Sequence, residues 1–467
     1  MERDGQLLLT EKSKEELIEE VLKLRQSREE LAQELLNLHE ENEKLKQALG
    51  AKEKSEARKK FLKALRLAQR LKHPKPPGQK PGHEGLTRVK PATIDRVMEQ
   101  TLKQCPDCRS PLSKTQEVLE HIQEDLIPAH PQVTLFKKHR YYCTHCEKMV
   151  TAPYAPEEVP HGYLGPNVLI QTVILKYHHG LPFNKIKELL ETLAHFQVSE
   201  GALAQALQRM SEWLGVEISQ ILKAIRKSPY LHMDETGWKV SGQNHWLWAV
   251  VNERLAYYRI AGSRGAKIPK QILPKDYGGV LVTDFYSAYT RLPGKKQKCL
   301  VHLLREMRQL YLKDQSEAFG KYHRILKRIL RDATRLKEIR PGLGSRVYRR
   351  RVKLLKERLF LWSCRDYRNK SLRRLAKRFL THWLHLLTFL EIPEISFNNN
   401  LAERMIRPHV ILRNRSFQNR SSQGAKAHET LMSLLHTLKL QGKDAIVFLQ
   451  KAYLRHRQGN PRPLLSF

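Results

Sequence analysis

The sequence predicts a multidomain α+β protein, and three observations lead to this fold class. Leucines recur in heptads over the first fifty residues. Two Cys-x-x-Cys pairs follow, at 105–108 and 143–146. Beyond residue 228, short apolar runs of strand length alternate with turn residues and precede a long stretch with helical spacing. We therefore expect a coiled coil, a cysteine-containing ribbon and a mixed sheet that carries a helical insertion.

The charge balance indicates a polyanionic partner. The 467 residues include 84 Lys and Arg against 48 Asp and Glu, a formal net charge of +36. Such an excess attracts nucleic acid, and the release of counterions makes the binding salt-dependent. No apolar run of 18 residues and no signal-peptide pattern is visible, and the cysteine usage fits a reducing cytosol. We expect a cytoplasmic protein that binds DNA and has no membrane segment.

Residues 1–50 predict a coiled coil. A leucine occurs every seven residues, and the position four residues after each leucine is mostly apolar. Asn42 falls on this second seam, where a buried polar group fixes the register. The pattern favours a two-stranded coil, and hence a homo-oligomer, over a single amphipathic helix packed on its own protein. The leucines are Leu17, Leu24, Leu31, Leu38 and Leu45.

Residues 51–90 predict a basic helix followed by a linker, because Pro and Gly at this density cannot continue a helix. Residues 91–160 then predict a zinc ribbon. Each Cys-x-x-Cys places two thiolates on a tight turn, and two such turns close a tetrahedral zinc site. The β-branched and aromatic residues at 132–142 predict a strand that leads into the second turn. The expected zinc ligands are Cys105, Cys108, Cys143 and Cys146, with inert or redox-active cysteines as the alternative.

Residues 161–226 have helical spacing. Two helices, at 181–191 and 198–207, are separated by a short break, and Ser199 is suited to cap the second. The pair resembles a helix-turn-helix, whose second helix enters a major groove. A plain helical hairpin in the core remains the alternative.

After residue 228 the periodicity changes to that of strands. Runs at 230–233, 245–251 and 255–260 predict three meandering strands, which are followed by a helix at 267–273 and a fourth strand at 279–282. This succession is the beginning of a ribonuclease-H-like mixed sheet. That fold places an Asp on its first strand beside an Asp on its fourth.

Three carboxylates are candidates for binding a divalent metal. Asp234 and Asp284 are expected to close strands, and Glu403 is expected on a helix rich in Asn and Arg. Mg²⁺ prefers oxygen ligands and keeps open positions for substrate phosphates, and two such ions can stabilise the attacking and leaving oxygens of a phosphoryl transfer. Each acid alone also has a purely structural explanation. Asp234 would cap a turn, Asp284 would cap the helix that follows it, and Glu403 would form an ion pair with Arg407 one helical turn further on.

These residues resemble the motifs of transposases of the insertion-sequence-66 family, which use DDE-type catalysis. The most specific match is Asn-Asn-x-Ala-Glu-Arg-x-x-Arg-Pro at 399–408. The chain departs from the family at Asn398, where an acid is usual, and residues 413–425 match its basic, aromatic, Gly-containing segment only loosely. Further matches are Asp-Glu-Thr-x-Trp at 234–238, Thr-Asp-Phe-Tyr at 283–286, Cys-x-x-His at 299–302, the two Cys-x-x-Cys pairs and Gly-Gln-x-Pro-Gly-His-x-Gly at 78–85.

The resemblance implies a bacterial, nucleoid-associated DNA transposase that cleaves and joins strands. Asp234, Asp284 and Glu403 would hold two Mg²⁺ or Mn²⁺ ions, and Arg404 and Arg407 would contact DNA from the same helix as the Glu. Transposon ends and target DNA would be its partners, and accessory transposition proteins are further candidates. The rivals are a dimeric zinc-containing DNA-binding regulator (a transposase remnant without catalysis) and a structure-specific nuclease with the same core.

The stretch between the second and third acids is long and basic. It spans 118 residues, more than such a sheet requires, and residues 303–392 predict a helical insertion between two parts of the core, 227–302 and 393–467. Residues 321–380 hold 22 Lys or Arg against four acids. A solvated face is the usual explanation of a charge run, but an excess of one sign favours contact with the DNA backbone. The residues proposed for it are Arg349, Arg350 and Arg351.

Four further polar residues near the three acids are not expected to be catalytic. Cys299 and His302 lie one helical turn apart and are expected to pack and orient the core, because two ligands make no closed metal site. Glu235 and Asp276 are expected to surround the site or to lie in solvent.

Overall fold

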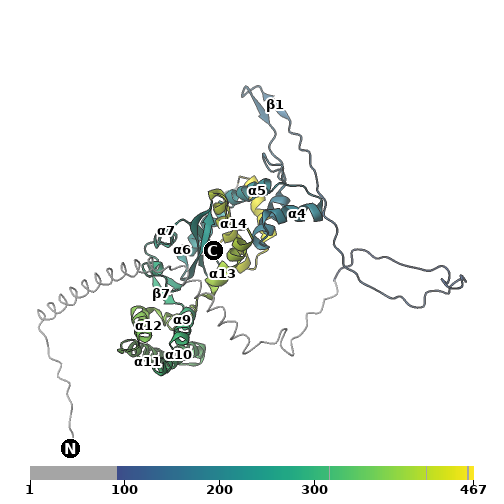
Figure 1. The fold of residues 1–467 in the computed structure, drawn as a ribbon. Helices are drawn as coiled ribbons and strands as arrows, with labels where there is room; N and C mark the ends of the chain where they lie inside the picture. The colour runs from purple at the N-terminus through teal and green to yellow at the C-terminus, as the bar shows by residue number, and fades with distance from the viewer. Residues whose placement is uncertain (1–91, 315, 417, 460–461) are drawn as a thin grey trace, which may run out of the picture. The chain divides into compact units, whose positions relative to one another are not determined.

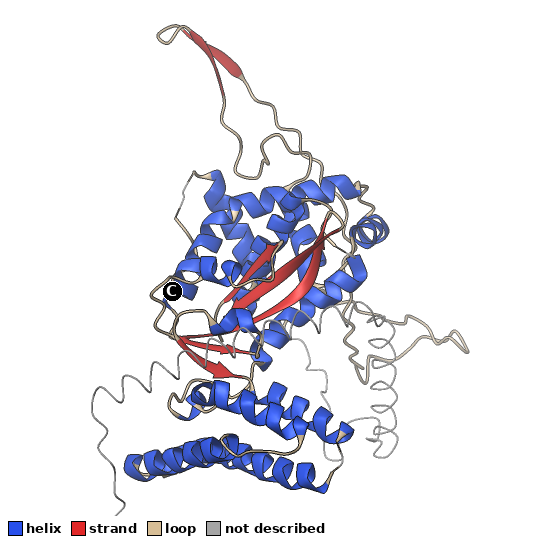
Figure 2. Cartoon of the chain, turned by 60° about the vertical axis from the view of Figure 1, so that its left-hand side comes forward, coloured by secondary structure: helices blue, strands red, loops and turns tan. Residues whose placement is uncertain are grey.

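The computed structural model describes residues 92–467 apart from 315, 417, 460 and 461. They belong to two compact units, one ending at His121 and the other running from Ile122 to Phe467. The predicted coiled coil and the basic helix with its linker lie outside the described residues. Helices and a mixed sheet make up the second unit, in agreement with the predicted α+β class (Figures 1 and 2).

A five-stranded sheet of order β5-β4-β3-β6-β7 lies at the centre of the second unit. The strands β3, β4 and β5 are antiparallel neighbours, and the turn between β3 and β4 takes Ser241 and Gly242 through positive φ angles. The strands β6 and β7 run parallel to β3. The strand bounds are Tyr230–Val240, Gln243–Val251, Ala256–Ala261, Val280–Thr283 and Lys295–Lys298 for β3 to β7. The helix α7 (Lys267–Ile272) precedes β6, and α8 (Ser287–Thr290) follows it.

The first strand is longer than the sequence predicts. The expected strand ended at residue 233, but β3 continues to Val240 and pairs with β4 from His232 to its end. The prediction that Asp234 closes a strand was therefore wrong, because pairing with β4 supports the polar residues that follow. Asp284, in contrast, directly follows β6 as predicted.

Helices from both ends of the second unit pack around β3, β4 and β5 in one core. The two helices predicted at 181–191 and 198–207 are present as α4 and α5, and the Ser199 side chain accepts a 3.1 Å hydrogen bond from the amide of Ala202, as expected of a cap. The helices are α3 (Pro166–Val173), the π-helix η1 (Ile174–His178), α4 (Phe183–Ala194), α5 (Glu200–Trp213), α6 (Gly215–Lys227), α13 (Asn400–Ser416), α14 (Ser422–Leu440) and α15 (Ala445–Arg457). None of the described helices is long and apolar enough to cross a bilayer.

The stretch between β7 and α13 is helical, as predicted, and forms a second core with Val280 and Val282 of β6. Its surfaces carry the long basic run, while leucines and aromatic side chains fill its interior. Figure 2 shows these helices as a layer of their own beside the sheet. They are α9 (Leu300–Lys313), α10 (Glu317–Glu338), α11 (Ser345–Ser363) and α12 (Lys370–His382), with short 3₁₀ turns at Arg340–Gly342, Trp383–His385 and Thr388–Leu390.

Candidate active site

The sheet places two of the three predicted acids side by side. The strands β3 and β6 are parallel neighbours, with Tyr230 opposite Val280 and His232 opposite Val282. Continued by two residues, this register brings Asp284 level with Asp234. Neighbouring strands lie about 4.8 Å apart, so the two carboxylates emerge close together.

Burial and neighbouring charges raise the pKa of Asp234 to about 7. Burial is the largest cause, and Glu235, Asp284 and Glu403 add repulsion. The three predicted acids therefore lie near enough to influence one another. A cation among them would offset this repulsion.

The third acid is held to the same strand by its neighbour Asn399. Glu403 lies in the first turn of α13, and its amide donates to the carbonyl of Asn399. The Asn399 side chain is fully buried and donates a 2.8 Å hydrogen bond to the Met233 carbonyl, one residue before Asp234. Its Oδ1 lies 3.2 Å from Nδ1 of His232. Asn399 therefore ties the helix that carries Glu403 to the strand that carries Asp234.

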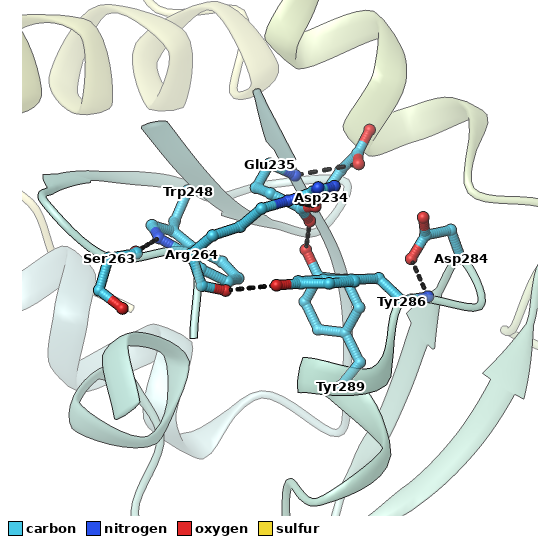
Figure 3. Close-up of polar contacts among 8 residues, drawn as sticks. All are labelled: Asp234, Glu235, Trp248, Ser263, Arg264, Asp284, Tyr286 and Tyr289. Carbon is cyan, nitrogen blue, oxygen red and sulfur yellow. Dashed lines mark hydrogen bonds and ion pairs between the residues drawn. The ribbon is translucent and has the colours of Figure 1, made fainter. Parts of the chain in front are cut away.

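Glu235 points to the other face of the sheet from Asp234, as neighbours in a strand do (Figure 3). Its side chain is only 2% exposed, so of the two expected positions Glu235 surrounds the site and does not lie in solvent. It accepts hydrogen bonds of 3.0 and 2.7 Å from Nε and Nη2 of Arg264, and a further hydrogen bond from the Tyr289 hydroxyl. The guanidinium of Arg264 also stacks on Tyr286, with its Cζ 4.3 Å from the centre of the Tyr286 ring.

The Tyr286 contacts extend this network to the second acid. The backbone amide of Tyr286 donates a 2.9 Å hydrogen bond to Oδ1 of Asp284, and the Tyr286 hydroxyl donates to the backbone carbonyl of Arg264 (Figure 3). The side chains around Asp234 and Asp284 therefore belong to one connected set. Asp276, the other acid considered, is exposed as expected.

A buried lysine lies beside the second acid, and no pattern in the sequence points to it. Lys298, in β7, donates to Oγ1 of Thr283 at 3.0 Å and to the carbonyl of Asp284 at 2.8 Å. Burial lowers the pKa of Lys298 to about 8, and the charge of Asp284 opposes that shift. Its ammonium fixes the backbone at the point where Asp284 leaves the sheet.

Cys299 and His302 meet the third acid. Their ligand atoms and a carboxylate oxygen of Glu403 all lie within 4.8 Å of one another. Nδ1 of His302 is 3.6 Å from Oε1 of Glu403, and neither atom has a hydrogen-bond partner although both are buried. Cys299 accepts a hydrogen bond from the amide of Asn399. These contacts agree with the predicted role of Cys299 and His302 in packing, and they lie at the start of the helix that carries Glu403. With Glu403, the two residues bring three potential metal-ligand atoms together.

The predicted acids fit divalent metal by the chemistry of their donors. All three offer hard oxygen atoms, Oε1 of Glu403 is buried without a partner, and the raised pKa of Asp234 marks crowded negative charge. Among the described residues, the three carboxylates do not form one group with all ligand atoms within 4.8 Å.

The arginines proposed for DNA binding are exposed. Arg404 and Arg407, three residues apart on α13, share one exposed side of the helix, while Met405 and Ile406 between them in sequence are buried. Within the described part of the chain, Glu403 forms no ion pair with Arg407, so the alternative explanation of Glu403 is wrong. Arg349, Arg350 and Arg351 are exposed on α11, in the insertion.

Each cysteine pair forms a turn suited to thiolate ligands. In the first, the Cys105 amide donates to the carbonyl of Ser110, and hydrogen bonds with Ser110 lower the pKa of Cys108. In the second, the strands β1 (Arg140–Cys143) and β2 (Lys148–Thr151) form a hairpin, and the Cys146 amide, 3.4 Å from Sγ of Cys143, lowers the pKa of Cys143. The predicted ribbon strand is thus present only at its end. The two pairs belong to separate units.

Comparison with known proteins identifies the family. Residues 161–427, more than half of the chain, match the model described as the Transposase IS66 family. The chain belongs to this family. Residues 103–147 of this IS66-family protein match the zinc-finger binding domain of transposase IS66. The matched regions include all three acids and all four paired cysteines.

Relatives of this IS66-family protein occur in Sinorhizobium fredii, where they are named only as uncharacterized proteins. The protein y4qI is 25% identical over 72% of this chain and 68% of its own. The protein y4jD is 24% identical over 76% of this chain and 75% of its own, and y4hP is 21% identical over 82% and 74%.

Proposed function

We propose that this IS66-family protein is a DNA transposase that cleaves and joins strands with Asp234, Asp284 and Glu403. The observation that carries the proposal is the parallel register that brings Asp284 level with Asp234, while Asn399 ties Glu403 to the same strand. Family membership supports the activity. Three antiparallel strands followed by two parallel ones, in the order β5-β4-β3-β6-β7, support a ribonuclease-H-like core.

The three acids would hold Mg²⁺ or Mn²⁺, which when bound supplies positive charge for the attacking and leaving oxygens. The chain itself would set the geometry. Asn399, Lys298 and the pair of Glu235 and Arg264 fix the backbone around the acids, so that water or a DNA 3′-hydroxyl meets the phosphorus in line. No covalent bond between protein and DNA is required.

DNA binding would rest on residues other than the acids. Arg404 and Arg407 lie exposed beside Glu403 and would contact the phosphates nearest the reaction. Arg349, Arg350 and Arg351 would contact the backbone from the insertion, and α4 with α5 would act as a helix-turn-helix. The four paired cysteines would bind one zinc. A homo-oligomer through residues 1–50 and accessory proteins stay predictions.

Substitution of one acid tests the proposal. Asp284→Asn keeps the shape of the side chain but removes the charge of a ligand, so cleavage of DNA carrying the inverted repeats that flank the gene should be lost. Asp276→Asn, at an exposed acid before the other end of β6, is the matched control and should cleave normally. Binding to the same DNA should persist in both variants. Cleavage should need Mg²⁺ or Mn²⁺ and fail with Ca²⁺, whose longer bonds misplace the reacting oxygens.

Three outcomes would contradict this proposal. Appreciable cleavage by Asp284→Asn in Mg²⁺ would exclude the proposed metal site. Binding of the DNA without any cleavage by the wild-type protein would favour a DNA-binding regulator. Cleavage without any joined product, in an assay that supplies a target duplex, would favour the nuclease instead.

A further inference from the structure

A concave site lies on the face of β3 that carries Asp234, beyond the acids. Its volume is about 650 Å³, and η1, α4, α5, β3, α13 and α14 contribute to its wall. Arg413 connects it to the acids, because its guanidinium donates to the Thr236 hydroxyl and the Gly237 carbonyl. Trp238 lies four residues from Asp234, hence on the same face and about 13 Å away at the usual rise of a strand. This distance corresponds to roughly four base-pair steps of DNA.

The loop from α13 to α14 forms one wall, and it is the segment that matches the family only loosely. Two hydrogen bonds hold Asn419 of this loop to the end of β3. The Ser241 amide donates to the backbone carbonyl of Asn419, and Nε1 of Trp238 donates a 2.8 Å hydrogen bond to Oδ1 of Asn419. The wall is therefore fixed to the strand that carries Asp234.

The rim of the pocket is positively charged. Arg413, Arg415 and Arg420 line it, and within the described residues none of them has a carboxylate within 4 Å. Lys185 also lines it and pairs with Glu188. Unpaired guanidinium groups around a cavity favour an anionic ligand such as phosphate.

A buried lysine adds to this charge inside the pocket. Lys176, in η1, is 6% exposed. Its Nζ donates a 3.1 Å hydrogen bond to the Ser416 hydroxyl and lies 4.4 Å from the centre of the Phe183 ring. Burial lowers the pKa of Lys176 to about 8, against the influence of Glu200. A bound anion would favour the charged form of this amine.

The floor of the pocket is buried and mostly apolar, in contrast to the charged rim. Its residues are Leu207, Trp238, Ala427 and His428. His428 is 1% exposed and shares one hydrogen bond, between its Nε2 and His409, while its Nδ1 has no partner in the described part of the chain. An apolar floor with an unpartnered polar atom suits a nucleobase, which has flat apolar faces and polar edges.

We propose that this pocket holds one unpaired nucleotide of the bound DNA, with its phosphate at Lys176 and Arg415 and its base over the floor near His428. The inference rests on the proposed function and adds to it a position on the path of the DNA. The volume lies in the range of ordinary ligand pockets, about 300–1,000 Å³. Because extracting a paired base costs unstacking energy, the protein should prefer DNA that already contains an unpaired nucleotide.

Competition binding tests this preference. Two short duplexes of one sequence, fully paired or carrying a single-nucleotide bulge, are compared in Ca²⁺ so that no strand is cut. The wild-type protein should bind the bulged duplex roughly ten-fold more tightly, the scale of one stacked base.

Two variants locate the preference in the pocket. Gly201→Trp introduces a ring at the wall, where a Cβ meets no atom closer than 3.9 Å, and it leaves every charge in place. It should reduce the ratio of the two affinities to about one, whatever it does to the affinity for paired duplex, to which α5 contributes in the proposed function. Arg415→Gln should reduce the ratio as well. Lys443→Gln removes the same charge from an exposed turn outside the pocket and should keep the wild-type ratio.

Three results would overturn the proposal. They are equal binding of the two duplexes by the wild-type protein, an unchanged ratio in Gly201→Trp, and pocket-dependent binding of a free deoxynucleoside monophosphate without any preference for the bulge. The last result would assign the pocket to a small nucleotide. None of these assays involves cleavage, so the Asp284→Asn experiment reports on the acids separately.

Discussion

The side-chain amide of Asn399 donates a hydrogen bond of 2.8 Å to the backbone carbonyl of Met233. The same residue contacts His232 through its Oδ1, and its backbone amide donates to Sγ of Cys299. One fully buried residue thus connects the strand of Asp234, the start of α9 and the helix of Glu403. The relative positions of two catalytic candidates depend on a residue that carries no charge.

Asn399→Ala should therefore separate positioning from chemistry. The change leaves the Met233 carbonyl buried without a donor, which costs about 1–3 kcal/mol of unfolding free energy. Cleavage should fall by about 100-fold, because small displacements of reacting groups have large effects on rate. Denaturant unfolding and single-turnover cleavage provide the two measurements. Asn400→Ala changes the exposed neighbour and should behave as wild type; equal cleavage by both variants would contradict the proposed positioning.

Arg264→Gln should destabilise the protein by leaving Glu235 buried without its cation. We expect a loss of about 1–2 kcal/mol, less than for a fully buried pair because the Arg264 side chain is 49% exposed. A Glu235→Gln change in the same protein should restore part of the stability, because the unpaired charge is then removed as well. Thermal unfolding of the single and double variants measures this coupling. Additive losses would show that the two side chains act independently.

Three buried histidines should make the fold sensitive to acid. His409, His428 and His436 lie between β5, α13 and α14, and burial lowers the pKa of His428 and of His436 to about 3. The unfolded chain binds protons at these positions below about pH 6.5 and the folded chain does not, so stability is lost as pH falls from about 6.5 towards 3.

Unfolding free energies measured between pH 7 and pH 5 should show this slope, and His436→Gln should reduce it by about 1.4 kcal/mol per pH unit at most. His130→Gln, in an exposed loop, is the control. A slope that His436→Gln leaves unchanged would mean that other groups govern the acid sensitivity.

Neutralising the exposed arginines of α11 tests whether the insertion binds DNA. When Arg349, Arg350 and Arg351 are all changed to Gln, the dependence of log affinity on log salt should flatten by roughly 0.9 for each phosphate that the variant no longer neutralises. Titrations over a range of salt concentrations measure this slope. An unchanged slope would identify the surface as an ordinary solvated face.

Zinc analysis tests the cysteine pairs. Protein purified without chelator should contain one zinc per chain, and Cys105→Ser should lower that content while leaving the far-ultraviolet spectrum of the helices nearly unchanged. Cys364→Ser, which removes an exposed cysteine outside the pairs, should retain the metal. Metal-free wild-type protein would exclude the zinc site.

The sequence predicts the parts of the fold that follow hydrophobic periodicity. The four predicted strands and the helices predicted at 181–191, 198–207 and 267–273 follow apolar patterns, and each begins within two residues of its predicted start, whereas β3 and α5 run well past their predicted ends. The strand β7 escapes this kind of prediction, because its residues are Lys-Lys-Gln-Lys. The last three of them are buried and make tertiary hydrogen bonds, such as those of Lys298 to Thr283 and of Gln297 to Leu386, which no local pattern reveals.

The sequence predicts the candidate site as three acids, but it does not predict the residues that position them. Asn399 belongs to the matching motif, yet its role depends on the pairing of β3 with distant helices. For Glu235 the sequence left open whether it surrounds the site or lies in solvent. Its partner Arg264 lies 29 residues further on, and only the completed sheet brings the two together.

The insertion leaves the core and returns to it at almost the same point. The amide of Leu300, at its start, donates a 2.9 Å hydrogen bond to the carbonyl of Phe397, near its end. A segment with adjoining ends imposes little strain on its host whatever its length, since the entropy of closing a loop grows only slowly with chain length. In the proposed function, a longer or shorter insertion would therefore change the reach along DNA while the three acids keep their positions.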